Sequence, residues 1–351
     1  MRPAFQVAPA VSTSMMHKKH KAIGLISGGL DSILAEKMVL EQDVEVIGVC
    51  FTSPFFDKSV HAIPIAEKSG IDLKIINFGY EYISLIKNPI HGYGKNINPC
   101  IDCHTYMLKQ AKKLMEELNA DFVFTGEVLN ERPMSQHLNA LKLIEKESGL
   151  TGKLLRPLSA QLLEPTIPET TGIIDRKRLS SISGRSRKSQ IALAKMYGIN
   201  DFPQPAGGCL LTDESFCKRL KDAFEHYEDS LNDLELLKIG RHFRMSDKDA
   251  AKIVVGRNEK ENSGILSLKR DSDIILEPVE IVGPIVLIRR MVGQDFSLAN
   301  LKVYPMTLQI AAELCARYSD KGNSNLVKIK VGDIIIDIEP INEKLINEMR
   351  I

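Results

Sequence analysis

The chain has 351 residues, of which 44% are hydrophobic and 26% are charged, and its formal net charge is +1. These values are ordinary for a globular protein of two or three domains with real cores. The near-zero charge provides no overall field for nucleic acid or membrane, so any polyanion site must come from local clustering.

No apolar run approaches the ~20 residues that a membrane span needs. The first residues lack the long apolar core of a secretory signal, so a disordered leader at 1–20 and a cytoplasmic location away from membranes are expected. Six cysteines occur, at positions 50, 100, 103, 209, 217 and 315. In a cytoplasmic protein they are not expected to form a disulfide framework, which leaves some of them for chemistry.

The first part of the chain alternates apolar strands with helical patterns. Strands are predicted at 22–27, 44–51, 71–78 and 121–127, and helices at 32–40, 59–70 and 105–120. Alternation of this kind predicts an α/β domain with a doubly wound parallel sheet over roughly residues 20–200.

After about residue 230 the segments are short, β-branched and punctuated by glycine, with one helix predicted at 308–319. This texture predicts a smaller C-terminal domain that is α+β or β-rich. The expected organisation is a leader at 1–20, a nucleotide domain at 21–215, a linker helix at 216–238 and a C-terminal domain at 239–351.

A strand that ends in Ser-Gly-Gly-Leu-Asp-Ser, residues 27–32, and then becomes a helix predicts an anion site. Gly28 and Gly29 let the backbone approach a ligand, and the helix N-terminus supplies free N–H groups. Asp31 would repel a phosphate unless it serves a bound Mg²⁺ or a catalytic contact. The alternative is a tight turn with an Asp or Ser cap.

These six residues resemble the SGGxDS loop of the PP-loop ATP pyrophosphatase superfamily, whose fold is that of the adenine nucleotide α-hydrolases. The resemblance implies that ATP is cut between its α and β phosphates to adenylate a substrate. It implies ATP contacts at Ser27, Gly28, Gly29, Leu30, Asp31 and Ser32, at Val49 and Phe51 on the second strand, and at Gly126 after the fourth. A Walker GxxxxGK[ST] motif is absent, which disfavours γ-phosphate chemistry.

Cys100 and Cys103 form a C-x-x-C motif that is predicted to precede the helix from residue 105. A helix N-terminus favours the thiolate, which is both a nucleophile and a metal ligand. Cys209 follows Gly207 and Gly208. Buried packing, a redox dithiol and half of a zinc site with His104 remain alternatives.

The segments NPCIDC (98–103) and 124–159 resemble tRNA-thiolating PP-loop enzymes, in particular tRNA 4-thiouridine synthases. The matching features in the second segment are Thr125-Gly126, Ser135-Gln136, a helix from Asn139 to Ile144, and Leu154 to Leu158. This resemblance covers roughly residues 20–215 and implies that Gln136 also lies in the ATP site.

The resemblance implies a reaction in which ATP, with Mg²⁺, adenylates a uridine carbonyl oxygen of tRNA and sulfur then displaces AMP. Some relatives use two catalytic cysteines as a persulfide pair, here Cys103 and Cys209. Others hold a [4Fe-4S] cluster with three cysteines, here Cys100, Cys103 and Cys209. The extra Cys100 favours the cluster. The sulfur donor would be sulfide or a persulfide carrier such as a cysteine desulfurase, and a homodimer remains open.

RNA contacts are expected outside the usual N-terminal module of 4-thiouridine synthases, which is not seen ahead of the loop. One source is a basic cluster in a polar connector at 168–190. It comprises Arg176, Lys177, Arg178, Arg185, Arg187 and Lys188. Its alternatives are a solvated face and contact with the nucleotide phosphates.

The second source is residues 252–290, which are similar to the RNA-binding module of NFACT-type proteins through their Val-Gly-Arg-Asn (255–258) and Asn262. This implies RNA contact by Arg257 and Asn258. The alternative is a β domain that only buttresses the enzyme.

The sequence thus favours an ATP-dependent tRNA sulfurtransferase. A PP-loop ligase or amidotransferase that adenylates a small molecule is the main alternative, and it would not need the three cysteines. A non-catalytic RNA-binding protein is disfavoured by the intact SGGLDS loop.

Overall fold

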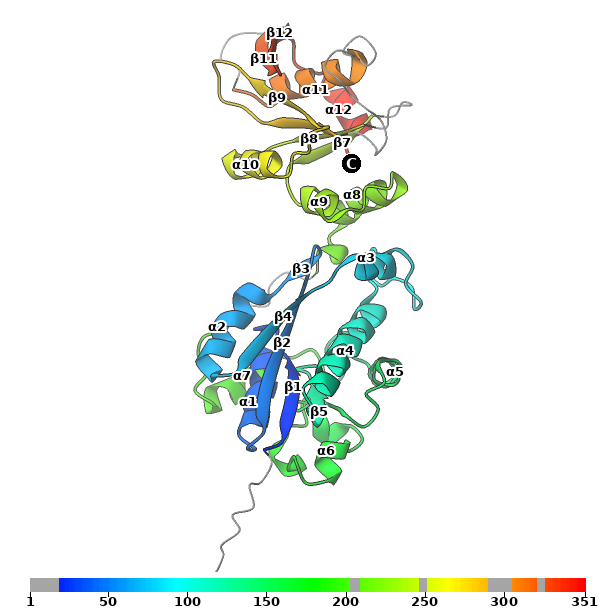
Figure 1. Ribbon diagram of the computed structural model, residues 1–351, viewed down its shortest axis with the longest axis vertical. Coiled ribbons are helices and arrows are strands. Elements are labelled where there is room, and N and C mark those ends of the chain that lie inside the picture. The colour runs from blue at the N-terminus through cyan, green and yellow to red at the C-terminus, as the bar shows by residue number, and fades with distance from the viewer. Residues whose placement is uncertain (1–18, 203–208, 246–250, 290–304, 321–325) are drawn as a thin grey trace, which may run out of the picture. The chain divides into compact units, whose positions relative to one another are not determined.

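The computed structural model describes residues 19–202, 209–245, 251–289, 305–320 and 326–351 (Figure 1). Residues 1–18 of the predicted leader lie outside this part of the chain. The chain divides into two compact units. Unit 1 comprises Met1–Phe51, Lys58–Asn77 and Ile101–Pro205, and unit 2 comprises Thr52–Asp57, Phe78–Cys100 and Ala206–Ile351. The domain boundaries given above stay predictions.

The N-terminal half alternates strands and helices, as the sequence predicts. Its strands are β1 (Lys21–Leu25), β2 (Glu45–Ser53), β3 (Phe56–Asp57), β4 (Asp72–Asn77), β5 (Phe122–Phe124) and β6 (Leu154–Leu155). Its helices are α1 (Leu30–Leu40), α2 (Ser59–Ser69), α3 (Tyr80–Lys87), α4 (Cys100–Glu117), α5 (Leu138–Ser148), α6 (Ile167–Thr170) and α7 (Lys188–Met196), with 3-10 turns η1 (Ala160–Leu162) and η2 (Arg176–Arg178).

The first sheet has the strand order β3-β2-β1-β5-β6, with β4 paired to β2. β1 runs parallel to β2 and to β5, β5 runs parallel to β6, and the short β3 pairs antiparallel with β2. The predicted α/β fold is confirmed, with a mainly parallel sheet. In Figure 1, α2 and α7 lie on one side of these strands and α4 on the other. The strand order reverses between β1 and β5, and ligands of α/β sheets bind beyond the carboxyl ends of strands at such a point.

The C-terminal half forms a second sheet. A 3-10 turn η3 (Leu210–Thr212) and helices α8 (Glu214–Glu225) and α9 (Leu231–Leu236) precede it. Its strands are β7 (Arg241–Arg244), β8 (Lys252–Val255), β9 (Ile274–Pro278), β10 (Val286–Arg289), β11 (Val327–Val331) and β12 (Ile334–Ile338). The remaining helices are α10 (Glu259–Ser267), α11 (Pro305–Arg317) and α12 (Glu343–Met349). Every pairing in the order β12-β11-β9-β10-β8-β7 is antiparallel.

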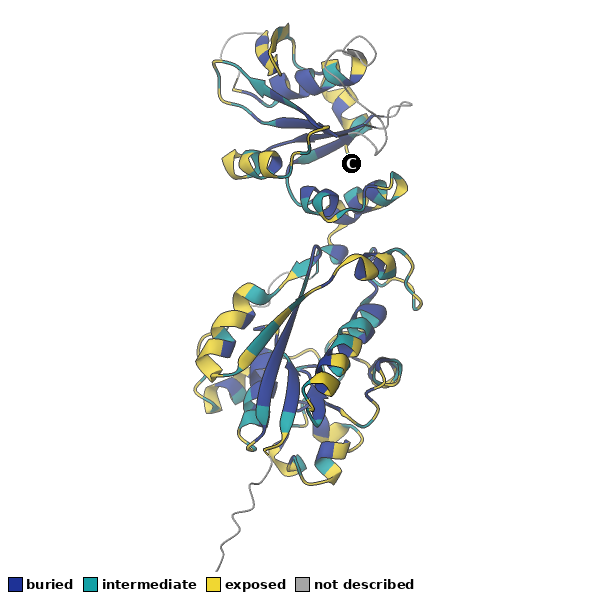
Figure 2. Ribbon diagram, viewed as in Figure 1, coloured by how far each residue is buried: buried dark blue, intermediate teal, exposed yellow. Residues whose placement is uncertain are grey.

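Both faces of the second sheet are covered at β8 and β10, whose residues are all buried, whereas β11 alternates buried and exposed residues and β12 is largely exposed (Figure 2). Ile253 and Ile288 face a core that includes Cys315 of α11. Val254 and Leu287, one residue along each strand, face a second core that contains residues of α9 and α10. The alternation follows from the two-residue period of a strand.

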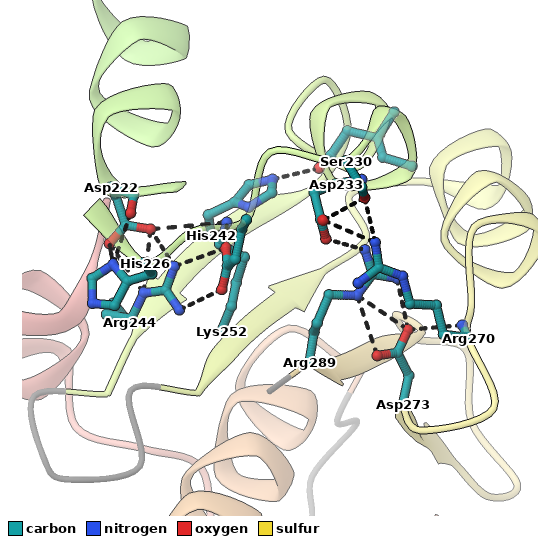
Figure 3. A network of polar contacts seen from close by, with 12 residues as sticks. Asp222, His226, Ser230, Asp233, His242, Arg244, Lys252, Arg270, Asp273 and Arg289 are labelled. Atoms are coloured by element: carbon teal, nitrogen blue, oxygen red, sulfur yellow. Dashed lines mark hydrogen bonds and ion pairs between the residues drawn. The ribbon is translucent and has the colours of Figure 1, made fainter. Parts of the chain in front are cut away.

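Buried ion pairs fasten α8 to this sheet (Figure 3). Arg244 on β7 donates to Asp222 of α8 at 3.0 Å and to Glu228 at 2.8 Å, and Lys252 on β8 pairs with the same Glu228. Burial by itself would lower the pKa of Arg244, but the two carboxylates outweigh it and raise that pKa. Removing one partner would leave an uncompensated buried charge, so the helix is held firmly in place.

Arg289 makes the corresponding connection for α9 (Figure 3). This residue is 1% exposed and donates to Asp273 at 2.7 Å and to Asp233 of α9 at 3.1 Å. Residues 216–238, for which the sequence predicts a linker helix, therefore form most of two helices that pack within unit 2.

One predicted helix start was wrong. The helix expected from residue 105 begins at Cys100, so the C-x-x-C motif occupies its first turn instead of preceding it. Pro99 suits a helix start because it lacks the N–H that would otherwise be left unpaired there. The Asp102 carboxylate in the first turn interacts favourably with the positive end of the helix dipole. Among the described residues, no helix is both long and apolar enough to cross a bilayer.

Glu36 of α1 is a buried carboxyl whose ionisation opposes folding. It is 1% exposed, and burial raises its pKa to about 7 although Ser69 partly compensates. A folded pKa above the unfolded value means that stability is fully present below the unfolded pKa and falls as the pH rises toward 7. The loss above pH 7 is up to about 3 kcal/mol.

The Glu36→Gln variant should therefore be more stable than the wild type at pH 8 by about 1–3 kcal/mol and not at pH 4.5. Chemical denaturation of both proteins at the two pH values measures the difference. Equal differences at both pH values would show that folding does not change the pKa of Glu36. Glu41→Gln, a change at an exposed acid on the same helix, provides the control.

Candidate active site at the switch point of the first sheet

The turn between β1 and α1 leaves its backbone open to a ligand. Gly28 has φ +71°, and a Cβ there would lie 2.4 Å from the backbone of His61, so only glycine fits. Gly29 is the N-cap of α1 and provides no side-chain cap. Ser32 donates from Oγ to the Gly29 carbonyl at 2.8 Å and accepts from the Ser27 N–H at 3.3 Å, which fixes the turn. The uncapped helix start therefore fits a phosphate group.

Gly126, directly beyond β5, closes the other side of this turn. A Cβ on Gly126 would lie 2.6 Å from the Asp31 carbonyl carbon and 2.6 Å from the Ser32 nitrogen. The ends of β1 and β5 thus meet through backbone alone. The residues predicted from the loop motif and from the fourth strand are brought together.

Asp31 lies in the first turn of α1, where burial and nearby arginines shift its pKa in opposite directions. Burial raises the pKa of Asp31, whereas Arg187, Arg132 and the Gln190 amide act to lower it. The amide of the fully buried Gln190 lies close enough to Asp31 to favour the carboxylate, but within the described chain no hydrogen bond of good geometry reaches Asp31 Oδ1 or either amide atom of Gln190. Buried polar groups are nearly always paired, so these atoms fit a bound polar ligand. Asp31 would hold Mg²⁺ beside the phosphates if the ion binds here.

Sequence reasoning missed Glu131, Arg132 and Gln190. Burial raises the pKa of Glu131 and the Asp31 carboxylate raises it further, which places the two acids within electrostatic reach. The loop from 128 to 136 carries Glu131 there, because Leu129 forms a bridge to Ser183 and the N–H of Asn130 donates to the Gln136 carbonyl at 2.7 Å. No motif signals these residues, since they come from a loop about 100 positions and from helix α7 about 160 positions away from Asp31.

The other predicted ATP contacts have visible structural partners. The Val49 carbonyl accepts from the Ile26 N–H at 2.9 Å, where β2 extends past the end of β1. Val49 and Phe51 therefore lie on the strand next to the loop, and both are buried. Gln136 is buried and its Oε1 accepts from the Arg132 N–H at 3.2 Å, so it shapes the loop that carries Arg132. Direct nucleotide contact by these three residues stays a prediction.

The three predicted sulfur-chemistry cysteines belong to different parts of the division described above. Cys100 and Cys209 fall in unit 2 and Cys103 falls in unit 1. Cys100 and Cys103 lie one turn apart on α4, an arrangement whose thiols suit a shared metal or a dithiol. Within the described residues, however, no three His, Cys, Asp or Glu side chains form a metal-binding group. The donor chemistry of the three thiols fits an iron–sulfur cluster.

Cys209 is attached to the hairpin between β2 and β3. The Phe55 carbonyl accepts from the Leu210 N–H at 3.0 Å and from Cys209 Sγ at 3.7 Å. Phe55 itself is buried and packs edge-on against Phe216 of α8 at 6.2 Å. The preceding segment Pro205–Gly208 lies outside the described residues.

His104 has a stronger environment than the sequence indicates. Its Nδ1 lies 2.9 Å from Glu127 Oε1, and Glu127 Oε2 accepts from Arg156 Nε at 3.0 Å. Burial alone would raise the pKa of Glu127, but Arg156 and His104 outweigh it and hold it at about 2. The carboxylate therefore stays ionised and fixes the orientation of the imidazole beside the C-x-x-C turn.

The basic connector separates into two groups. Arg176 donates to Glu169 within the connector at 2.5 Å, and Arg178 donates to the Glu41 carbonyl after α1 at 2.7 Å. Both side chains are therefore used in bonds within unit 1. Arg187 precedes α7 and faces Asp31, on the nucleotide side. The exposed members are Lys177, Arg178, Arg185 and Lys188. RNA contact by any of the six stays a prediction.

The VGRN signature has a structural role in unit 2. Asn258 caps α10 by accepting from the Glu261 N–H at 3.0 Å, and Arg257 pairs with Glu261 at 2.9 Å. A Cβ on Gly256 would lie 2.0 Å from Asn262 Oδ1, which explains the glycine. The predicted RNA contacts of Arg257 and Asn258 thus compete with bonds inside the domain.

Two family profiles match this chain. Residues 17–164 match the thiamine biosynthesis protein ThiI, and residues 240–349 match the NFACT protein RNA binding domain. The N-terminal part is ThiI-like and the C-terminal part is NFACT-like. Both resemblances were predicted from the sequence.

Curated relatives match the N-terminal part as well. The chain is 25% identical to the tRNA-specific 2-thiouridylase MnmA of Clostridium kluyveri over 46% of its own length and 50% of the relative's. It is 32% identical to the same enzyme of Clostridium acetobutylicum over 32% and 36%. The chain thus spans half or less of the length of these relatives.

A solved structure, the U34-tRNA thiolase NcsA from Methanococcus maripaludis with its [4Fe-4S] cluster, is 19% identical. It aligns with a TM-score of 0.33 over 63% of this chain and 72% of its own.

The Gly126→Ala variant tests the close approach of β5 and α1. The added Cβ must displace the first turn of α1, so we expect ATP affinity to fall roughly tenfold or more. Isothermal titration with ATP and Mg²⁺ measures the effect, and thermal unfolding checks the fold. Gly79→Ala is the matched control, because a Cβ there meets nothing within 4 Å and its φ is ordinary. Equal ATP affinity in both variants would contradict the proposed phosphate site at the turn between β1 and α1.

Proposed function

We propose that this protein is an ATP-dependent tRNA sulfurtransferase that replaces a uridine carbonyl oxygen with sulfur. The carbonyl oxygen attacks the α-phosphorus of ATP and pyrophosphate leaves. Asp31 would hold Mg²⁺, which when bound would neutralise phosphate charge. A sulfur nucleophile then forms the C–S bond as AMP departs with the former carbonyl oxygen. The sulfur comes from sulfide or from a persulfide carrier.

The observation that carries the proposal is the glycine-lined turn of Ser27–Ser32 at the switch point, with unpartnered Asp31 and Gln190 atoms beside it. This arrangement supports nucleotide binding with phosphates at the α1 N-terminus. Arg132 and Arg187 supply positive charge on the same side. The similarity to tRNA thiolases and to an RNA-binding module supports tRNA as the substrate.

We assign the sulfur step to Cys103 and Cys209, with Cys100 as the third member. Three thiolates match the ligand number of a [4Fe-4S] cluster with one open iron, which when bound would hold a sulfide for transfer. A two-cysteine persulfide cycle needs no third thiol. His104, fixed by Glu127, would orient a hydrogen bond next to Cys103 in either case.

Serine variants of the three cysteines test the sulfur step. Cys100→Ser, Cys103→Ser and Cys209→Ser should each abolish thiouridine formation, because each removes a thiolate, while adenylation measured by ATP–pyrophosphate exchange continues. Nucleoside mass spectrometry of tRNA incubated with the protein provides the readout. Cys315→Ser, a change at a buried cysteine of α11 in the unit 2 core, is the control. Full thiolation by all three variants would refute the role assigned to the cysteines. A wild type that forms no thiouridine, with ATP turnover kept in all three variants, would point to the small-molecule ligase instead.

Anaerobic purification separates the two sulfur routes. We expect a brown protein with iron and acid-labile sulfide, and we expect Cys100→Ser to lose the colour. Ultraviolet–visible spectra and iron analysis measure this. A colourless, iron-free protein that thiolates tRNA with a persulfide donor would exclude the cluster and leave the sulfurtransferase proposal intact.

A further inference from the structure

The loop that follows β8 is a rigid frame on unit 2. Glu261 accepts from the Arg257 N–H at 3.0 Å, from the Arg257 guanidinium at 2.9 Å and from the Gly240 N–H at 3.2 Å. Asn262 Oδ1 accepts from the Ile285 N–H at 3.0 Å. Residues from three segments, before β7, after β8 and before β10, are thereby held together.

Arg241 lies on this frame and is stacked on an aromatic ring. Its guanidinium carbon is 4.3 Å from the centroid of the Tyr318 ring, and its Nη1 donates to the Gly256 carbonyl at 3.4 Å. Tyr318 follows α11 and is fixed there, because Gly283 packs so closely on Ser319 that a Cβ would lie 2.4 Å from Oγ. One face of the half-buried guanidinium therefore lies on the Tyr318 ring, and its edge is held by the Gly256 carbonyl.

Two further arginines of unit 2, Arg257 and Arg219, lie near this stacked pair, and each has an acidic neighbour. Arg257 is 46% exposed and is balanced by Glu261. Burial lowers the pKa of Arg219 on α8. The charges of Asp213, Arg257 and Glu261 also act on this pKa, so these three residues lie near Arg219. Its buried Nε has no partner within the described residues. No carboxylate pairs with Arg241 in the part of the chain that the structure describes.

The position of Arg219 depends on the ion pairs of α8. Asp222, three residues later on the same helix face, is bound by Arg244 of β7 (Figure 3). Since residues three apart share a helix face, this bond turns Arg219 toward β7. His242, one residue after Arg241, is accordingly among the groups that feel the charge of Arg219.

We propose that the platform formed by Arg241 on Tyr318, with Arg219 and Arg257 beside it, binds an unpaired nucleotide of RNA. The base would stack on the guanidinium plane and its phosphate would face the arginines. Only the identity of the RNA as tRNA rests on the proposed function. An acidic peptide would use the charges but not the stacked plane, so the geometry favours RNA.

The test measures binding of a fluorescent single-stranded RNA to the full chain by anisotropy over a range of salt concentrations. Arg241→Gln and Tyr318→Leu should each weaken binding roughly tenfold. Arg241→Gln should also lower the slope of log affinity against log salt by about 0.7, whereas Tyr318→Leu should leave the slope unchanged. Arg241→Lys keeps the charge but loses the planar guanidinium, so its RNA affinity should lie between those of the wild type and Arg241→Gln.

Lys330→Gln is the matched control, because it removes one charge from an exposed β11 lysine that pairs with Glu277. It should bind as the wild type does, and thermal unfolding should show that every variant folds. Wild-type affinity in Arg241→Gln and Tyr318→Leu, or an equal loss in Lys330→Gln, would overturn the inference. So would equal competition by polyglutamate and by unlabelled RNA for the wild type.

The two proposals fail separately. A wild-type protein that binds this RNA through Arg241 and Tyr318 but never thiolates tRNA would refute the sulfurtransferase and leave the platform standing. Thiolation that persists with unchanged RNA affinity in both variants would refute the platform alone.

Discussion

The candidate site depends on the backbone contact between Gly126 and the first turn of α1. Because no side chain separates them, the carboxyl ends of β1 and β5 meet where the strand order reverses. The helix start is thereby fixed with its N–H groups open, and Asp31 is drawn inward among Arg132, Arg187 and Gln190. A phosphate site follows from this contact, since the same geometry excludes side chains and exposes donors.

Unit 2 is organised by charge instead of by close backbone contact. Arg244 and Arg289 each join a helix to the sheet through carboxylates that are themselves buried. Buried pairs of this kind contribute little net stability but tolerate no missing partner. They therefore specify where α8 and α9 lie, and with α8 they place Arg219 beside the Arg257 loop.

Several residues that the sequence marks for ligand contact are used by the fold. Asn258 caps a helix, Gln136 shapes a loop, and Arg176 and Arg178 fasten a connector. Conversely, His104 looks isolated in the sequence but is held by a buried ionised carboxylate. A motif records which residue types occur together, whereas the hydrogen bonds record what each one does.

The sequence by itself determined the α/β order, the phosphate turn and the two resemblances, because period, glycine placement and short motifs are local properties of the chain. It placed the start of α4 five residues late, since Cys-Ile-Asp-Cys carries no strong helix signal. Only the tertiary structure brought Glu131, Arg187 and Gln190 to Asp31 and stacked Arg241 on Tyr318. These partners are separated by about 80 to 160 positions, and strand order and helix packing, not local pattern, decide which of them meet.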